Sequence, residues 1–380
     1  MNGGSGRWLW ELYRRLPPGT VHVAANNWPG AEEFDRSHDL AISRLPLRFS
    51  NWGMFGCRGL GEYARALWAL RALVRQVRPS VIHCGKCIPE GFLARLLRLW
   101  GGPEYWCFAH GEELTLARTS SELRWMTRRA LRGARRVIAN SRHTRSILVR
   151  DWQVPGKRIV VLHPGVDTHK FTPFRVDPEV RGRLGWGDRP VILTVGALQK
   201  RKGQDMLIRA LPMIREKIPN VLYAVAGEGW EQPYLEGLVA KLGVERSVQF
   251  LGIPNDAELV RYYQQCDLFA LPNRQVGWDF EGFGIVLLEA QACGKPVLAG
   301  ASGGTRETMD VPHTGRVVTC ESSDDLAKMV VLLLRSPDLR ARMGERARRW
   351  VVERFDWEAL TRQARGAFAV EAGRLAASGA

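Results

Sequence analysis

Short runs of apolar residues alternate along the chain with longer segments in which apolar side chains recur every three or four positions. The short runs are typical of buried strands, and the longer segments are typical of helices with one apolar face. Strands are predicted at 21–25, 81–84, 105–109, 136–139, 159–162, 191–195, 221–226, 248–251 and 267–271. Helices are predicted at 59–78, 89–100, 141–150, 204–217, 231–242 and 256–265, and two more near 338–353 and 356–372. This alternation predicts an α/β protein with parallel sheets, which bind ligands at the carboxyl ends of their strands.

The first residues depart from this alternation. Gly3 and Gly4 lead at once into an amphipathic helix that carries Trp8 and Leu12 and ends before Pro17. A Rossmann-like domain places its first, central strand immediately before such a glycine turn. We therefore expect the first domain to lack that strand, either because the start codon was assigned too late or because the chain is truncated.

Two carboxylates near the end of the second half are the strongest chemical signal. Glu281 and Glu289 flank seven residues, of which Gly282 and Gly284 allow a close approach of the backbone to a ligand. A helical pattern begins at about Gly284, so the amides of Phe283, Gly284 and Ile285 are expected at a helix N-terminus, which favours an anion. The two acids can then reach hydroxyls on either side of a phosphate. This arrangement suits a nucleotide-sugar.

The stretch 281–308, EGFGIVLLEAQACGKPVLAGASGGTRET, resembles the Glu-x7-Glu signature of retaining glycosyltransferases of family 4. Within that family it is most similar to the phosphatidylinositol mannosyltransferases, and the resemblance covers nearly the whole chain. It implies the GT-B fold, in which two Rossmann-like domains face a cleft. Residues 1–173 would form the acceptor-side domain, residues 174–353 the nucleotide-sugar domain, and residues 354–380 a helix that crosses back to the first domain.

The resemblance also implies roles for individual residues. Glu281 would bind hydroxyls of the transferred sugar, and Glu289 the ribose hydroxyls of the donor. His110, from a His-Gly motif, would face the donor sugar. The remaining donor-binding positions are the basic and glycine-rich ones: Gly3, Gly4, Arg201, Lys202, Gly282, Phe283, Gly284 and Ile285.

The basic loop 196–203 departs from the family at one position. Its Lys202 matches the lysine that contacts the donor phosphates, but Ala197 stands where the family usually has an arginine. Arg201 or Lys200 could substitute, although neither occupies the same backbone position. Because the family needs no metal, these groups must stabilise the departing diphosphate, and no metal or other cofactor is expected.

The resemblance implies transfer of a hexose with retention of configuration, to a lipid-linked or cell-envelope glycan acceptor. GDP-mannose is the favoured donor, and a UDP-sugar is the alternative, because the loop 252–256, which would contact the base, does not distinguish the two. A nucleotide-sugar epimerase of similar fold is a rival enzyme. Ala197 and the missing strand favour a third alternative, an inactive protein that only binds nucleotide-sugars.

The charge indicates a second partner. The net charge is +16, and nine arginines lie between Glu122 and Arg150, interleaved with Trp125 and Met126. This pattern fits a helix at an anionic membrane surface, a nucleic-acid site or an ordinary solvated face, and we expect a peripheral membrane contact and no nucleic acid. Seven scattered cysteines and the absence of a long apolar run favour a soluble, cytoplasmic protein. The lone pair Cys84 and Cys87 predicts reduced thiols, because a metal site would need more ligands.

Overall fold

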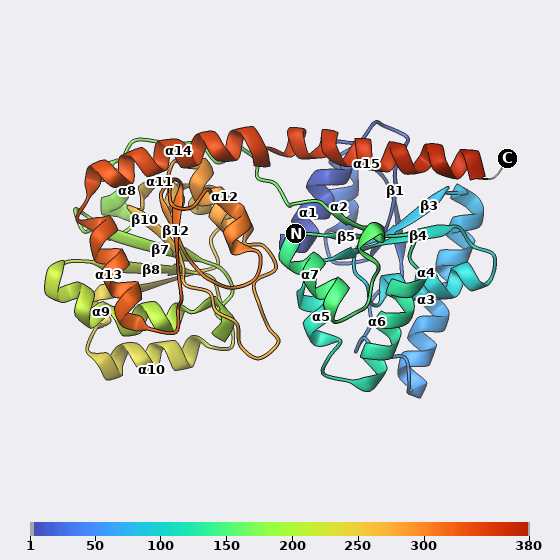
Figure 1. Cartoon of the computed structure of the whole chain (residues 1–380), viewed down its shortest axis with the longest axis horizontal. Helices are drawn as coiled ribbons and strands as arrows, with labels where there is room; N and C mark the ends of the chain where they lie inside the picture. Colours follow the sequence, from blue (N-terminus) through green and yellow to red (C-terminus); the bar gives the residue numbers. More distant parts are fainter. Residues whose placement is uncertain (1–3, 379–380) are drawn as a thin grey trace. The chain divides into compact units, whose positions relative to one another are not determined.

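The computed structural model describes residues 4–378, with their side chains as far as Phe368. The chain divides into two compact units (Figure 1). One holds the residues up to His163 together with those from Leu360 onward, and the other spans Pro164–Ala359. The compact units divide after residues 163 and 359, whereas the predicted domains divide after residues 173 and 353. Val166 and Phe171 explain the first of these differences, because both side chains are buried in the core of the second unit.

The second unit is built on a six-stranded parallel sheet with the order β12-β11-β10-β7-β8-β9. Its strands are β7 (Val191–Val195), β8 (Leu222–Ala226), β9 (Val248–Gly252), β10 (Leu268–Leu271), β11 (Val297–Gly300) and β12 (Gly315–Val318). Successive residues of a strand enter different cores: Leu193 packs on one side of the sheet and Ile192 on the other. Both faces are covered, and for this reason the strands are continuous apolar runs in the sequence.

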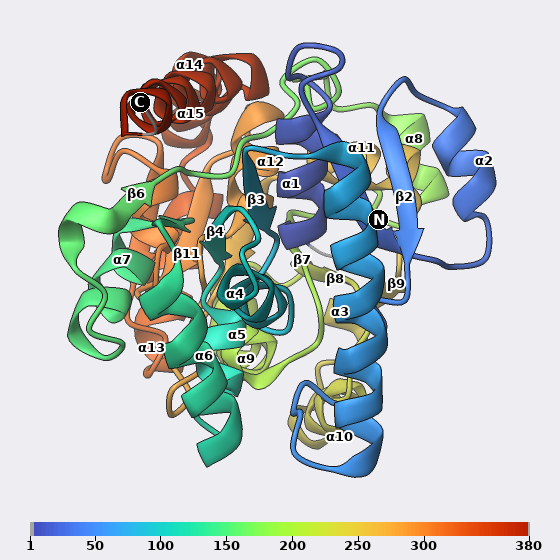
Figure 2. The same cartoon turned by 90° about the vertical axis from the view of Figure 1, so that its right-hand side faces the viewer.

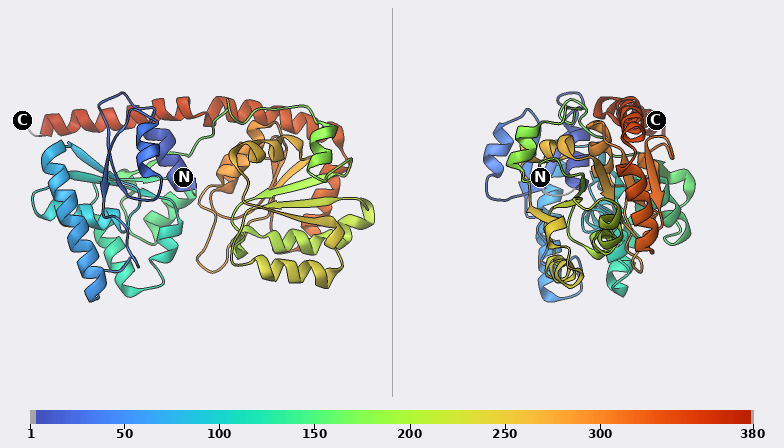
Figure 3. Two further views of the ribbon diagram at one scale, coloured as in Figure 1. Left: turned by 180° about the vertical axis from the view of Figure 1, so that it is seen from behind. Right: turned by 90° about the vertical axis from the view of Figure 1, so that its left-hand side faces the viewer.

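Helices cover both faces of this sheet. One core includes side chains of α11 (Asp256–Gln265), α12 (Ile285–Ala292) and α14 (Pro337–Phe355). The other includes those of α9 (Gln204–Lys217), α10 (Gln232–Leu242) and α13 (Ser323–Leu334). Figure 3 shows the sheet from behind, between the yellow-green α9 and α10 and the orange α12. A short α8 (Pro178–Arg183) completes the unit.

The first unit contains two separate parallel sheets. One pairs β1 (His22–Asn26) with β2 (Ala41–Leu45), and the other has the order β3 (Val81–Cys84), β4 (Glu104–Ala109), β5 (Arg136–Ala139) and β6 (Ile159–Val161). Among residues 4–378 no strand precedes α1 (Gly4–Tyr13). The other helices of this unit are α2 (Ala31–Arg36), α3 (Cys57–Val77), α4 (Glu90–Leu99), α5 (Glu112–Leu116), α6 (Ser121–Gly133) and α7 (Arg142–Arg150), with the part of α15 (Trp357–Ser378) from Leu360 onward. The helix α1 packs against the larger sheet, since Trp8 meets Phe108 edge-on at 5.1 Å between ring centroids.

Two helices of this unit turn apolar side chains outward. In α3 the buried residues are Gly59, Tyr63, Ala66 and Leu67, whereas Leu60 is 58% exposed. The backbone approaches closely at Gly59, where a Cβ would lie 2.6 Å from the Gly53 carbonyl oxygen, so this side of the helix is the inner one. In α6 the neighbouring residues Trp125 and Met126 differ in exposure: Met126 is buried, whereas Trp125 is exposed. In the part of the chain that the structure describes, no helix has both the length and the apolar character needed to cross a bilayer.

Candidate active site

The loop after β7 carries the two cations predicted to bind phosphate. Lys200–Lys202 form a single 3-10 turn, which Gly203 closes with a φ of 73°. A Cβ at Gly203 would lie 1.8 Å from the Pro272 carbonyl oxygen, so only glycine allows the turn to reach the end of β10. The amide of Arg274 then donates to the Arg201 carbonyl oxygen at 2.8 Å. Arg201 and Lys202 are thereby fixed at the carboxyl edge of the sheet.

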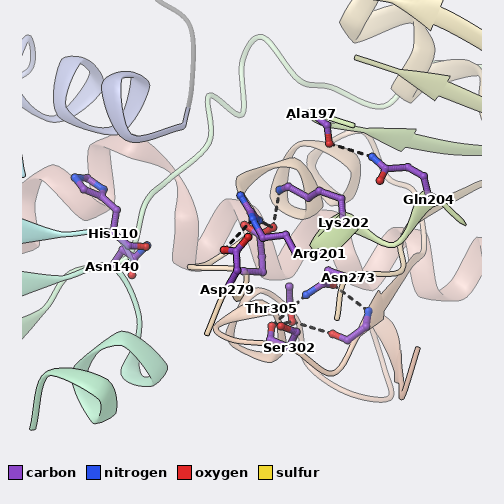
Figure 4. A network of polar contacts seen from close by, with 12 residues as sticks. His110, Asn140, Ala197, Arg201, Lys202, Gln204, Asn273, Asp279, Ser302 and Thr305 are labelled. Atoms are coloured by element: carbon purple, nitrogen blue, oxygen red, sulfur yellow. Dashed lines mark hydrogen bonds and ion pairs between the residues drawn. The ribbon is translucent and has the colours of Figure 1, made fainter. Parts of the chain in front are cut away.

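The two cations meet on one oxygen atom of Glu281. Figure 4 labels both cations, Arg201 and Lys202. Lys202 Nζ donates to Glu281 Oε2 at 2.5 Å, and an Arg201 guanidinium nitrogen donates to the same oxygen at 2.8 Å. Arg201 Nε also lies 3.4 Å from a carboxylate oxygen of Asp279. The predicted residues Arg201, Lys202 and Glu281 therefore form one cluster, and Asp279 joins them.

The electrostatics of this cluster keep Glu281 ionised. Burial alone would raise the pKa of Glu281, but the charges and hydrogen bonds of Lys202 and Arg201 hold it below its ordinary value. Two positive and two negative side chains balance one another here. A diphosphate at this edge could become the new partner of both cations, which would leave the Glu281 carboxylate to accept from hydroxyl groups.

The backbone of Glu281 is fixed by the glycines of the same signature block. Gly304 donates its amide to the Glu281 carbonyl oxygen at 2.9 Å. Gly303 has a φ of 64°, and a Cβ there would lie 1.8 Å from that same oxygen. The buried Asn273 links the neighbouring loops, because its amide nitrogen donates to Ser302 and its oxygen accepts from the Gly300 amide. The positive φ and the close approach explain why glycine stands at 303.

The second carboxylate of the signature lies in α12 and has a different partner. Gly284 caps this helix in the left-handed region, with a φ of 95°, and Ile285 is the first helical residue. Glu289 is buried one turn further on, where its Oε2 accepts from the Tyr263 hydroxyl at 2.7 Å. Phe283 is a core residue that packs near Phe355, so it can offer a ligand only its backbone.

His110 follows β4 in the first unit and is held at three atoms. Its amide donates to Glu113 Oε1 at 2.8 Å, and its carbonyl oxygen accepts from the Asn140 side chain at 2.8 Å. The ring Nε2 lies 2.7 Å from the Gly85 carbonyl oxygen, which can only accept, so Nε2 carries a proton. Burial lowers the pKa of His110 to about 4, and the ring is neutral at pH 7. Nδ1 is then the acceptor.

The carboxyl group of Glu113 gives the first unit a pH-dependent stability. Burial raises the pKa of Glu113 to about 7, although the His110 amide opposes the shift. The folded chain keeps this proton until about pH 7, whereas the unfolded chain releases it near its ordinary value of 4.5. Between pH 5 and pH 8 this group therefore removes about 2.5 kcal/mol from the free energy of unfolding.

Glu113→Gln is expected to abolish this contribution, because a carboxamide does not titrate and still accepts from the His110 amide. Relative to the wild type, the variant's free energy of unfolding should rise by about 2.5 kcal/mol from pH 5 to pH 8. Urea titrations of both proteins at the two pH values measure this change. A difference between the proteins that is independent of pH would contradict it.

The other predicted positions belong to other segments of the chain, and one of them lies outside the residues that the structure describes. Gly4 begins α1 in the first unit, and Gly3 lies outside the described residues. Ala197 exposes its methyl group, and its carbonyl oxygen accepts from Gln204 at 3.1 Å (Figure 4). Sequence reasoning missed Asp279, Tyr263 and Glu113. Only Asp279, two residues before Glu281, stood close enough to the signature to be found.

Comparison with known proteins decides the family. A family model described as Glycosyltransferase Family 4 matches residues 2–170, and one described as Glycosyl transferases group 1 matches residues 176–350. The chain is 38% identical over 358 residues to a GDP-mannose-dependent alpha-(1-6)-phosphatidylinositol monomannoside mannosyltransferase of Mycolicibacterium smegmatis, covering 90% of this chain and 88% of that protein. The chain belongs to glycosyltransferase family 4.

A second relative supports this family membership, and a solved structure shows the fold. A Mycobacterium tuberculosis protein with the same description is 34% identical over 375 residues, which is 94% of this chain and 92% of that protein. Among solved structures, Anabaena HepE in complex with UDP superposes with a TM-score of 0.81 at 22% identity, over 97% of each chain. The predicted GT-B fold and the predicted glycosyltransferase family are both confirmed.

Proposed function

We propose that this family 4 enzyme transfers mannose from GDP-mannose to a lipid-linked acceptor with retention of configuration and without a metal ion. The observation that carries the proposal is the convergence of Lys202 and Arg201 on one oxygen of Glu281, at the carboxyl edge of the sheet. It supplies cations for a diphosphate and a carboxylate for sugar hydroxyls. The relatives described as GDP-mannose-dependent supply the donor and the class of acceptor.

The protein's part in the reaction is to position the donor and to stabilise the leaving group. The bond between the sugar C1 and the diphosphate oxygen breaks, and a bond from C1 to the acceptor oxygen forms on the same face. A donor phosphate oxygen takes the acceptor proton. Lys202 and Arg201 neutralise the charge that grows on the GDP diphosphate, and Glu281 holds the mannose hydroxyls.

The remaining family positions act as donor contacts in this proposal. Glu289 binds the ribose hydroxyls, and the N-terminal amides of α12 face a phosphate. His110 accepts a hydrogen bond from a sugar hydroxyl at Nδ1, since its Nε2 proton is held by the Gly85 carbonyl oxygen. The loop that follows β9, residues 252–256, contacts the base.

Nucleotide release from a panel of GDP- and UDP-sugars, in excess EDTA and with a membrane-lipid extract as acceptor, tests the donor. We expect GDP release that depends on both GDP-mannose and the lipid, with a rate that EDTA leaves unchanged. Release of UDP instead would mean that the donor is a UDP-sugar. A change of the donor sugar without acceptor would indicate an epimerase, and donor binding without turnover would indicate a binding protein.

We also propose that the enzyme works as a peripheral protein at the cytoplasmic face of an anionic membrane. A surface over α3, α4 and α6, here called the aromatic-basic surface, supports this proposal. Its large apolar side chains are 40–66% exposed: Phe55, Leu60, Trp68, Leu99, Trp100 and Trp125. Figure 2 looks onto α3 and α6. Seven free thiols agree with a reducing compartment.

Charge and aromatic rings alternate on the aromatic-basic surface. The rings of Trp68 and Trp100 lie 6.3 Å apart between centroids, with the Arg71 guanidinium 5.7 Å from the Trp100 ring. Arg129 lies 5.6 Å from the ring of Trp125 in the same way. Exposed tryptophans and arginines are the combination that binds at the level of anionic headgroups, so the surface fits an anionic lipid bilayer.

Replacing Trp68 and Trp100 together by serine is expected to weaken binding to phosphatidylinositol-containing vesicles by about tenfold, through lost apolar contact with the lipid. Vesicle sedimentation measures the binding. The matched control is Trp230→Ser, which changes an exposed tryptophan of the second unit. Equal binding by the double variant and the wild type would contradict the proposal that the aromatic-basic surface binds the membrane. Binding that added salt leaves unchanged would contradict it as well.

A further inference from the structure

Tyr263 reaches one of the two signature carboxylates from a different helix. Its hydroxyl donates to Glu289 Oε2 at 2.7 Å, and the two side chains are 0% and 2% exposed. Tyr263 belongs to α11 and Glu289 to α12, and they stand 26 positions apart in the sequence. A hydrogen bond from a neutral donor to a buried carboxylate is strong, because the low local dielectric favours charge-assisted contacts.

The ring of Tyr263 is itself held firmly in place. It meets Phe171 edge-on, with ring centroids 5.8 Å apart and planes at 79°, and it contacts Phe269 at 5.5 Å. Phe269 belongs to β10, so the tyrosine is packed against the central part of the sheet. The phenol oxygen therefore has one well-defined position, and it imposes that position on the carboxylate.

The helix that carries Tyr263 begins at the end of the loop 252–256, which is proposed to contact the base of the donor nucleotide. Asn255 caps α11, accepting from the amides of Ala257 and Glu258 at 3.0 Å each. The Glu258 carboxylate in turn accepts from the Asn255 backbone amide at 2.8 Å. A well-capped helix of ten residues thus joins the loop after β9 to the phenol that holds Glu289.

We propose that Tyr263 is a positioning residue, which orients the Glu289 carboxylate toward the two ribose hydroxyls of the nucleotide-sugar. This inference rests on the proposed function, in which Glu289 binds the ribose. A carboxylate has lone pairs for several donors, so the bond from Tyr263 leaves capacity for a vicinal diol. The tyrosine fixes the plane of the carboxylate, and both hydroxyls can then be met without reorientation of Glu289.

Tyr263→Phe tests this role, because it keeps the packed ring and removes only the hydroxyl. The donors are GDP-mannose and its 2′,3′-dideoxyribose analogue, which has no ribose hydroxyls. With GDP-mannose we expect KM to rise about tenfold and kcat to change by less than about twofold, since the lost contact orients a donor-binding group. With the analogue, wild type and variant should have the same KM.

Glu289→Gln and the double variant of Tyr263→Phe with Glu289→Gln distinguish a failure of this inference from a failure of the proposed function. Glu289→Gln should raise KM for GDP-mannose and not for the analogue, and Tyr263→Phe should add little to it. If Tyr263→Phe raises KM equally for both donors, the tyrosine is merely structural and the inference is overturned. If Glu289→Gln itself does not distinguish the donors, the ribose role of Glu289 in the proposed function is wrong.

Discussion

Replacing Lys202 with alanine is expected to lower kcat by about 10²–10³-fold, the effect of removing one donor that stabilises a developing negative charge. Lys202 is buried, and its ammonium group donates to Glu281 at the edge of the sheet where the diphosphate is expected. Arg201 still pairs with Glu281 in the variant, so the fold should survive. Steady-state release of GDP from GDP-mannose measures the loss.

Lys200→Ala is the matched control for this experiment. Lys200 lies in the same 3-10 turn but is exposed. Its removal changes the net charge by the same amount and should leave kcat within about twofold, because exposed charges act weakly through water. Equal losses in the two variants would mean that the loop acts through its overall charge, which contradicts the assignment of Lys202.

Replacing Glu281 with glutamine has the second large effect, and it acts on both activity and stability. A carboxamide cannot neutralise Lys202 and Arg201, and it offers the sugar hydroxyls a weaker acceptor. We expect kcat to fall by about 10²-fold, and the free energy of unfolding to fall by about 3 kcal/mol, because the buried Lys202 and the partly buried Arg201 lose their shared partner. GDP release and urea titration measure the two effects.

Asp279→Asn provides a graded comparison for Glu281→Gln. Asp279 lies 3.4 Å from Arg201 and its side chain is 41% exposed, so its loss should cost clearly less activity and stability. The double variant Lys202→Ala with Glu281→Gln should fall short of the product of the two single losses, since the residues act as one unit. Fully multiplicative losses would show that they act independently.

The sequence predicts most of the framework because the buried strands are short and apolar on both faces. The strand 191–195 and the helix 204–217 have the predicted bounds in the structure. The buried side of α3 is not determined by periodicity alone, because apolar residues occur on more than one side of that helix. The exposed Leu60 and Trp68 now belong to the proposed membrane contact.

The sequence predicts the residues of the candidate site that stand in local motifs, but not the contacts between them. Lys202 and Glu281 each stand in a recognisable glycine-rich segment, but nothing in the spacing shows that Lys202 and Arg201 both donate to one oxygen atom of Glu281. The bond from Tyr263 to Glu289 depends on which helices are neighbours on the sheet, and the burial of Glu113 depends on the elements packed around it. Such pairings follow from tertiary packing, which a local sequence pattern does not encode.

The most direct test of the account is the product formed from GDP-mannose labelled in its sugar. The chain is incubated with a lipid extract that contains phosphatidylinositol mannosides, and the label is located after phase separation, with the anomeric configuration of the new linkage read by NMR. The account predicts label in the lipid phase, as one additional hexose in α linkage. A β-linked product, or label that stays in the aqueous phase while donor binding is intact, would contradict it.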